Sequence, residues 1–172
     1  YLLRKADTFL KDWIKNPDRY PLIIKGARQV GKTETIREFA KTHYKNLIEI
    51  NFITEPSYKS IIAEGFSTDS ITRLISRIDP SKHFEPNETL IFFDEIQDFP
   101  EIATSLKFFK EDGKYDVICS GSLLGVQYHR IASISVGYKT DYQMHSMDFE
   151  EFLWAKGYTA EVIEDMLAHM LS

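Results

Sequence analysis

Apolar residues recur along the chain with two different spacings, which divide it into alternating helical and extended segments. Residues 2–14 place their apolar side chains on one helical stripe, and Asn16-Pro17-Asp18 ends this predicted helix. Further helices are predicted at 34–41, 57–64, 68–78, 101–111, 149–155 and 159–171. Short apolar or alternating runs predict strands at 21–25, 47–53, 89–95, 115–119 and 142–145. We assign no helix or strand to residues 126–141.

Strands that alternate with helices in this way predict an α/β fold, a doubly wound parallel sheet. The run Thr89–Phe93 agrees, because continuous apolar strands are typical of sheets buried on both faces. We expect one domain over residues 1–158, with the helix at 2–15 docked on it. The chain opens at Tyr1 rather than at a methionine, and its last helical pattern is unfinished. We therefore expect residues 159–172 to begin a C-terminal lid or a following domain that is cut short.

Composition narrows the classes of protein further. A single cysteine among 172 residues excludes a disulfide framework, and no apolar run is long enough to cross a membrane. No signal peptide opens the chain, since Leu2-Leu3 is followed at once by Arg4 and Lys5. We therefore expect a cytoplasmic protein. The net charge of −5 gives no support to nucleic-acid binding over the whole surface.

A phosphate-binding pattern lies between the strand predicted at 21–25 and the helix that follows it. It is G-x-x-x-x-G-K-[ST], here Gly26-Ala27-Arg28-Gln29-Val30-Gly31-Lys32-Thr33, with Glu34 next. In a strand–loop–helix context, backbone N–H groups and the helix dipole converge on phosphate oxygens. Lys32 then reaches the β- and γ-phosphates, and the Thr33 hydroxyl is a ligand for Mg²⁺. We expect residues 26–34 to bind a nucleotide.

Two carboxylates, Asp94 and Glu95, end the apolar run that begins at Thr89. The carboxyl ends of parallel strands form the edge at which open α/β sheets bind ligands. We therefore predict that Asp94 holds Mg²⁺ and that Glu95 orients and deprotonates an attacking water, as in nucleotide hydrolysis.

Several stretches together resemble an uncharacterised family of bacterial and archaeal P-loop ATPases in the AAA+ superfamily. They are GARQVGKT, LIFFDEIQDFPE, LKFF, ICSGSLLG and MDFEEFLWAKGY, and the resemblance covers about residues 1–158. It implies a three-layer sandwich of the additional-strand class, with strand order 5-1-4-3-2 and one strand between the Walker A and Walker B strands. A separate C-terminal domain often follows in this family.

The resemblance also implies roles for individual residues. Residues 26–33 match Walker A, and Leu90 to Glu95 match Walker B. The sensor 1 position, a polar residue at the end of the next strand, would be Ser120 or Ser122. Such a residue hydrogen-bonds the γ-phosphate or the attacking water.

One expected feature of the family is missing. Many members carry Gly-Arg where this chain has Gly137-Tyr138-Lys139, so an arginine finger cannot be placed, and Arg130 and Lys139 are the candidates. A second subunit or a C-terminal domain is the other expected source. The stretch Tyr138-Lys139-Thr140-Asp141 is similar to the guanine-reading Asn-Lys-x-Asp signature, but tyrosine replaces asparagine, so we favour adenine.

These features predict the nucleotide-binding domain of an AAA+-like ATPase, which cleaves ATP to ADP and phosphate with Mg²⁺ and is slow in isolation. One alternative is an ATP-gated switch that grips a protein or DNA partner with little turnover. Another is a P-loop phosphotransferase, which the adjacent Asp94 and Glu95 disfavour because a base that activates water is wasted in an enzyme that excludes it.

Overall fold

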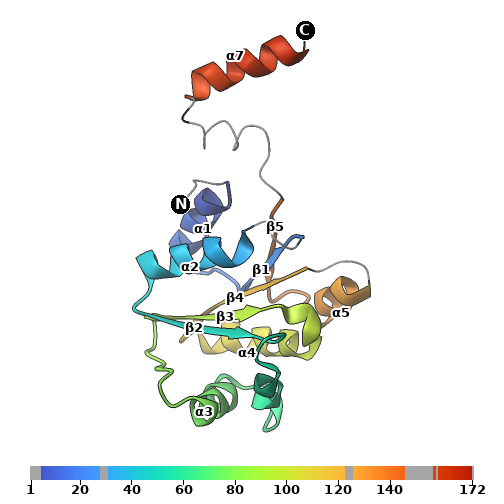
Figure 1. The fold of residues 1–172 in the computed structure, drawn as a ribbon. Helices are drawn as coiled ribbons and strands as arrows, with labels where there is room; N and C mark the ends of the chain where they lie inside the picture. Colours follow the sequence, from blue (N-terminus) through green and yellow to red (C-terminus); the bar gives the residue numbers. More distant parts are fainter. Residues whose placement is uncertain (1–4, 28–30, 123–125, 146–156, 158, 172) are drawn as a thin grey trace.

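The computed structural model of the protein describes residues 5–27, 31–122, 126–145, 157 and 159–171. Its strands form one all-parallel sheet in the order β2-β3-β4-β1-β5 (Figure 1). Their bounds are β1 (Leu22–Lys25), β2 (Asn46–Asn51), β3 (Thr89–Asp94), β4 (Asp116–Gly121) and β5 (Thr140–Gln143). The α/β class and the implied strand order are both confirmed. Strand β4 lies between β1, which precedes the phosphate loop, and β3, which ends at Asp94.

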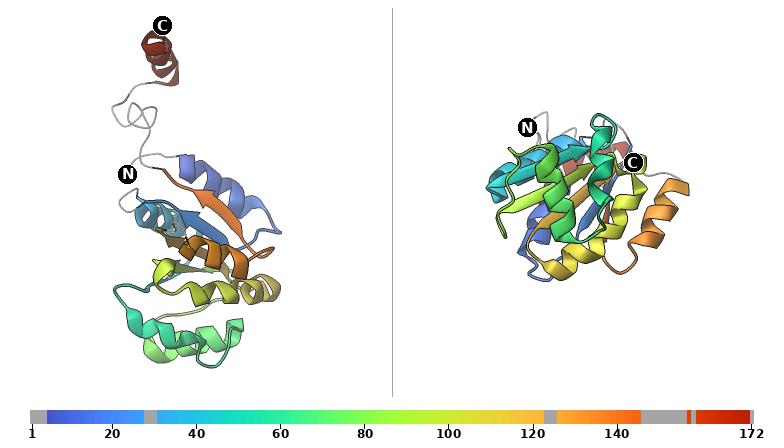
Figure 2. Two further views of the ribbon diagram at one scale, coloured as in Figure 1. Left: turned by 90° about the vertical axis from the view of Figure 1, so that its right-hand side faces the viewer. Right: turned by 90° about the horizontal axis from the view of Figure 1, so that it is seen from below.

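Helices cover both faces of this sheet and make three layers (Figure 2). On one face lie α1 (Lys5–Lys15) and α2 (Lys32–His43), where Leu10, Trp13 and Phe39 join a core built on β1, β3 and β4. On the other face lie α3 (Thr68–Ile78), α4 (Ser105–Asp112) and α5 (Val126–Ile134). Every residue of β3, an interior strand between β2 and β4, is buried, as expected for a strand between two helical layers.

Two stretches predicted as α-helices contain 3₁₀ segments, one over nearly its whole length and the other over its first turn. The stretch predicted as a helix at 57–64 is the 3₁₀ helix η1 (Pro56–Ile62), and residues 100–104 form η3 (Pro100–Thr104) before α4 begins. Proline stands at the start of both segments, where its missing N–H costs nothing, and 3₁₀ turns are common connectors at such places.

The helix α5 was not predicted from the sequence. Among the side chains described in α5, Ile131 is the buried one, so no apolar stripe marks the helix. The strand predicted at 142–145 is β5 and begins two residues earlier. The helix predicted at 149–155 lies outside the described residues. The last predicted helix is α7 (Ala160–Leu171), which lies away from the sheet (Figures 1 and 2).

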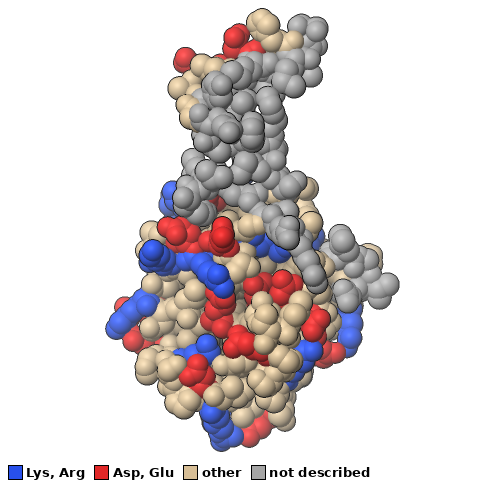
Figure 3. All heavy atoms as spheres, viewed as in Figure 1, with Lys and Arg blue, Asp and Glu red and all other residues tan. Residues whose placement is uncertain are grey.

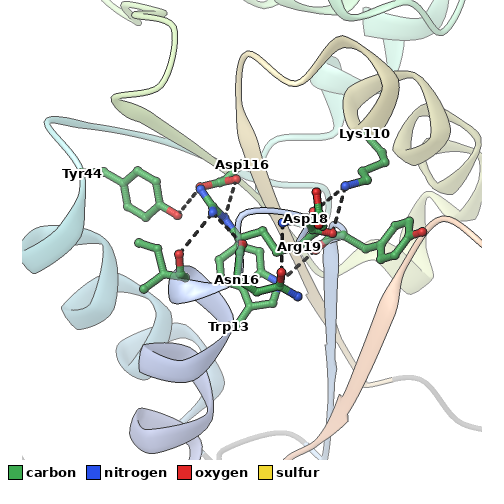
Figure 4. A network of polar contacts seen from close by, with 9 residues as sticks. Trp13, Asn16, Asp18, Arg19, Tyr44, Lys110 and Asp116 are labelled. Atoms are coloured by element: carbon green, nitrogen blue, oxygen red, sulfur yellow. Dashed lines mark hydrogen bonds and ion pairs between the residues drawn. The ribbon is translucent and has the colours of Figure 1, made fainter.

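A network of polar contacts at the amino edge of the sheet joins α4 and β4 to the segments that follow α1 and α2 (Figure 4). Arg19 donates through Nε and Nη2 to the two carboxylate oxygens of Asp116, at 3.0 and 2.7 Å, and the Tyr44 hydroxyl donates to the same carboxylate at 2.7 Å. Lys110 Nζ donates to the carbonyl oxygens of Asp18 and Arg19. Burial, together with the Asp116 charge, raises the pKa of Tyr44. We call Arg19, Tyr44, Lys110 and Asp116 the amino-edge network.

Candidate functional site

The phosphate loop follows β1 and leads directly into α2. Gly31 is the N-cap of α2 and has a φ of 87°, a left-handed conformation that glycine adopts without a Cβ penalty. Among the described residues no side chain caps this end of the helix, so the N–H groups of its first turn are available to an anion. Arg28, Gln29 and Val30, which the sequence assigns to the same loop, lie outside the described residues.

Lys32 is folded back onto the loop that precedes it. Its side chain is buried, and Nζ donates to the carbonyl oxygens of Gly26 and Ala27, each at 2.7 Å. A buried ammonium needs such acceptors. A phosphate oxygen would be a stronger acceptor than either carbonyl because it carries charge.

One hydrogen bond links the two motifs that the sequence separates by about sixty residues. Thr33 Oγ1 donates to Asp94 Oδ2 at 2.9 Å, and the backbone N–H of Glu95 donates to Asp94 Oδ1 at 2.9 Å. Burial raises the pKa of Asp94, and the nearby Glu95 charge adds to the increase, although both hydrogen bonds oppose it. A hydroxyl and a buried carboxylate side by side are the hard oxygen donors that Mg²⁺ prefers, so this pair fits the predicted metal site.

Glu95 lines an open cleft beside these groups. Its backbone is left-handed, with a φ of 57°, and it precedes the short 3₁₀ helix η2 (Ile96–Asp98). Non-glycine residues in this conformation are strained by about 1–3 kcal/mol and cluster at functional sites. The cleft has a volume of about 530 Å³ and is lined by Gly31, Lys32, Thr33, Glu34, Asn51, Ile53, Thr54 and Glu95.

Ser120 and Ser122, the two candidate sensor residues, carry unsatisfied hydroxyls. Both Oγ atoms are shielded from solvent and have no hydrogen-bond partner in the described part of the chain. Ile118 packs in the core beneath α2, and side chains alternate along a strand, so Ser120 faces the same layer as α2. A buried hydroxyl without a partner costs about 1–3 kcal/mol, which suits a group that waits for a ligand.

Two polar residues of this region were not predicted from the sequence. Asn51 ends β2 directly beside Asp94, and its side chain accepts hydrogen bonds from the backbone N–H groups of Ile53 and Thr54. Gln97 donates through Nε2 to Glu95 Oε2 at 2.5 Å. The implied strand order already places the end of β2 beside β3, and Gln97 belongs to the DEIQ stretch, so both signals were present.

The candidate cations for an arginine finger are engaged within the domain. Arg130 Nη2 binds Glu101 Oε1 at 2.7 Å on the surface. Lys139 is mostly buried and is paired with Asp141, which also accepts a hydrogen bond from Tyr128. Because Lys139 and Asp141 bind each other, the similarity of this stretch to a guanine-reading signature gains no support.

Comparison with known proteins agrees with this arrangement. The sequence profile described as the AAA domain matches residues 18–153. The chain belongs to the AAA domain family. The resemblance inferred from the sequence motifs is thereby confirmed at the level of the superfamily, and the AAA domain is a nucleotide-binding module of the ATPase type.

A solved structure shows the same fold. PCH-2 from C. elegans has a TM-score of 0.52 at 10% sequence identity, over 82% of this chain and 41% of PCH-2. The chain thus spans less than half the length of PCH-2, and at this identity the likeness concerns the fold alone. No curated protein matches the sequence.

The surface of the AAA domain carries mixed charge. Lysine and arginine are interspersed with aspartate and glutamate over the face shown in Figure 3. Within the described ranges, no helix combines the length and apolarity needed to cross a bilayer.

Proposed function

We propose that this AAA domain binds Mg²⁺-ATP in the cleft between the start of α2 and Glu95 and hydrolyses it to ADP and phosphate. The hydrogen bond from Thr33 to Asp94 carries the proposal, because it joins the phosphate loop to the carboxylate pair at one point. Glu95 follows Asp94 at once and lines the same cleft. Positioning and electrostatics supply most of the catalysis in this reaction class.

In this proposal, the uncapped N–H groups of α2 and the Lys32 ammonium bind the β- and γ-phosphates. Thr33 and Asp94 hold Mg²⁺, which when bound neutralises charge on the phosphate oxygens. Ser120 or Ser122 donates its free hydroxyl to the γ-phosphate or to the attacking water. Glu95 accepts the proton of that water, and a general base of this kind typically contributes about 10²–10⁴ in rate.

Turnover by the chain alone should be slow. Arg130 and Lys139 already bind carboxylates of their own domain. An arginine finger is worth about 10³–10⁵ in rate, so we expect fewer than about one turnover per second. We propose that a second subunit or a C-terminal domain supplies the missing cation, with residues 1–158 forming the ATPase domain and 159–172 beginning the next unit.

A switch is the second candidate function, and one observation favours it. Lys32 and Thr33 are held by acceptors of the protein itself, so an entering nucleotide must replace these hydrogen bonds. The loop and β3 would then differ between the free and bound states. A module of this kind could grip a protein or DNA partner according to its nucleotide state.

Calorimetric titration with ATP tests the assignment. Lys32→Ala removes a charge-assisted hydrogen bond worth about 1.5–3 kcal/mol, so ATP affinity should fall by about one to two orders of magnitude. Lys41→Ala, an exposed lysine of the same helix, is the matched control and should bind like the parent. Equal affinity in Lys32→Ala and the parent would contradict the proposal, and GTP that outcompetes ATP would contradict the adenine preference.

A further inference from the structure

Gln97 contacts the proposed general base but has no part in the mechanism above. Its Nε2 donates to Glu95 Oε2 at 2.5 Å, from two residues further along the chain. Within the described residues the second carboxylate oxygen, Oε1, accepts no hydrogen bond, while Glu95 lines the cleft. One oxygen of the base is therefore held and the other is left for a ligand.

The short turn that carries Gln97 is stable without this side chain. Its backbone is closed by hydrogen bonds from the Asp98 N–H to the Glu95 carbonyl and from the Phe99 N–H to the Ile96 carbonyl. Ile96 and Phe99 are buried in the core and anchor it on both sides. The contact between Gln97 and Glu95 is thus an addition to a turn that is already fixed.

The side-chain carbonyl oxygen of Gln97, Oε1, also argues against a purely structural role. This oxygen is shielded from solvent and has no hydrogen-bond partner in the part of the chain that the structure describes. An unsatisfied buried acceptor lowers stability by about 1–3 kcal/mol. An apolar side chain of the same length would avoid this loss, so the amide at position 97 is favoured by something other than folding.

A base that acts on water must present its oxygen in one orientation. A free glutamate has several rotamers, and fixing them costs free energy at the moment of reaction. In nucleophile and base systems, a third group commonly holds the base by a hydrogen bond. Gln97 stands in this relation to Glu95, which has a left-handed backbone and lines the cleft.

We infer that Gln97 is a positioning residue, which binds Glu95 Oε2 so that Oε1 faces the water attacking the nucleotide. The inference rests on the proposed hydrolysis. It implies that loss of the amide slows turnover, leaves nucleotide affinity unchanged and does not weaken the fold.

Two substitutions test it. Gln97→Met keeps the length and removes the donor, and a displaced reacting group can cost about 10²-fold, so single-turnover hydrolysis should fall by about 10- to 100-fold. Gln97→Glu replaces the donor by a second carboxylate and should be slower still. ATP affinity should stay within about twofold of the parent in both, and the melting temperature of Gln97→Met should equal or exceed that of the parent.

Asp98→Asn is the matched control, because Asp98 lies in the same turn and makes an exposed ion pair with Lys59. It should hydrolyse ATP at the parent rate. A loss of turnover in Asp98→Asn equal to that in Gln97→Met would contradict a specific role for Gln97, as would a Gln97→Met protein that melts well below the parent.

A measurement without nucleotide separates this inference from the proposed function. The side-chain amide signals of Gln97 in the ¹⁵N–¹H spectrum are assigned by their absence in Gln97→Met, and they should shift in Glu95→Ala. Unshifted signals overturn the inference. If the parent and Gln97→Met both hydrolyse ATP at the same rate, the role of Gln97 is wrong and the proposed hydrolysis stands. If the parent binds ATP but releases no phosphate, both the proposed hydrolysis and the role of Gln97 are wrong.

Discussion

At the amino end of β4 the Asp116 carboxylate accepts three hydrogen bonds, whereas at its carboxyl end the hydroxyls of Ser120 and Ser122 have no partner among the described residues. The same strand therefore carries a satisfied polar network at one edge of the sheet and unsatisfied polar groups at the other. The amino-edge network joins the segment after α1, the end of α2, α4 and the start of β4 (Figure 4).

The difference indicates what each edge contributes. Satisfied networks fix a structure, and unsatisfied buried groups lower its stability unless a ligand completes them. The carboxyl edge adds further departures from an ordinary interior, namely the left-handed Glu95 and the raised pKa of Asp94. We therefore expect substitutions at the amino edge to change stability and those at the carboxyl edge to change function.

The largest effect is expected from Glu95→Gln, at the carboxyl edge. The amide keeps the shape of the carboxylate but is too weak a base, so single-turnover hydrolysis should fall by about 10²–10⁴. ATP affinity and melting temperature should change little. Glu38→Gln, an exposed glutamate on α2, is the control. Hydrolysis at the parent rate would move the role of base to another residue and favour the switch.

Asp116→Ala tests the amino edge. It removes the acceptor of Arg19 Nε and Nη2 and of the Tyr44 hydroxyl. The side chains of Arg19 and Asp116 are only 25% and 19% exposed. Breaking a buried pair costs about 3–5 kcal/mol, so a partly exposed one should cost about 2–3 kcal/mol in the free energy of unfolding. Denaturant titration measures this.

ATP affinity of the folded Asp116→Ala protein should equal that of the parent. Asp98→Ala, which breaks the exposed pair with Lys59, should cost less than about 1 kcal/mol. If Asp116→Ala impaired nucleotide binding without lowering stability, the division between the two edges would be wrong.

The raised pKa of Asp94 predicts a pH dependence. As the pH falls through this pKa, the folded protein takes up the proton before the unfolded chain does, so the contribution of Asp94 to stability increases on acidification. The protonated form holds Mg²⁺ poorly. The rise in melting temperature caused by Mg²⁺-ATP should therefore shrink before the pH reaches about 4, where ordinary aspartates titrate.

Asp94→Asn is the control for this titration, because its smaller response to Mg²⁺-ATP should lack the component due to Asp94. The remaining pH dependence then belongs to the nucleotide. A parent and an Asp94→Asn protein with the same profile would show that Asp94 takes no part in holding the metal.

The smallest effects come from removing one hydroxyl at each edge, and they should have opposite signs. Ser120→Ala deletes an unsatisfied buried hydroxyl and should raise the free energy of unfolding by up to about 1 kcal/mol. Tyr44→Phe deletes a donor to the Asp116 carboxylate and should lower it by about 1.5 kcal/mol. Denaturant unfolding of both variants beside the parent measures these changes. If the two changes in the free energy of unfolding had the same sign, the contrast between the two edges would be wrong.

The parts of this molecule that the sequence predicts are those in which neighbouring residues carry the chemistry. The phosphate-loop pattern and Asp94-Glu95 are contiguous motifs, so the strands that they follow, β1 and β3, could be predicted without coordinates. The strand order came from the family resemblance, because hydrophobic spacing says nothing about which strands are neighbours. The helix predicted at 68–78 has the same bounds as α3, because its amphipathic pattern is clear. Ser67 caps this helix in the structure.

What the sequence did not predict depends on contacts between distant or weakly patterned segments. The helix α5 buries Ile131 but lacks a continuous apolar stripe. The closeness of Asn51 to Asp94 follows from strand register, and the tether from Gln97 to Glu95 follows from the geometry of a 3₁₀ turn. Neither register nor side-chain geometry can be obtained from spacing along one chain.

The position of β1 in the sheet bears on how the protein is made. Of the five strands described in the sheet, β1 leaves the ribosome first, yet its neighbours are β4 and β5, the last two of the five to emerge. At usual rates of synthesis, the time between the emergence of β1 and that of β5 is on the order of ten seconds. Until then the apolar residues Leu22, Ile23 and Ile24 lack the strands with which they pair in the sheet. In a nascent chain released before residue 140, β1 should therefore be an exposed apolar strand to which chaperones can bind.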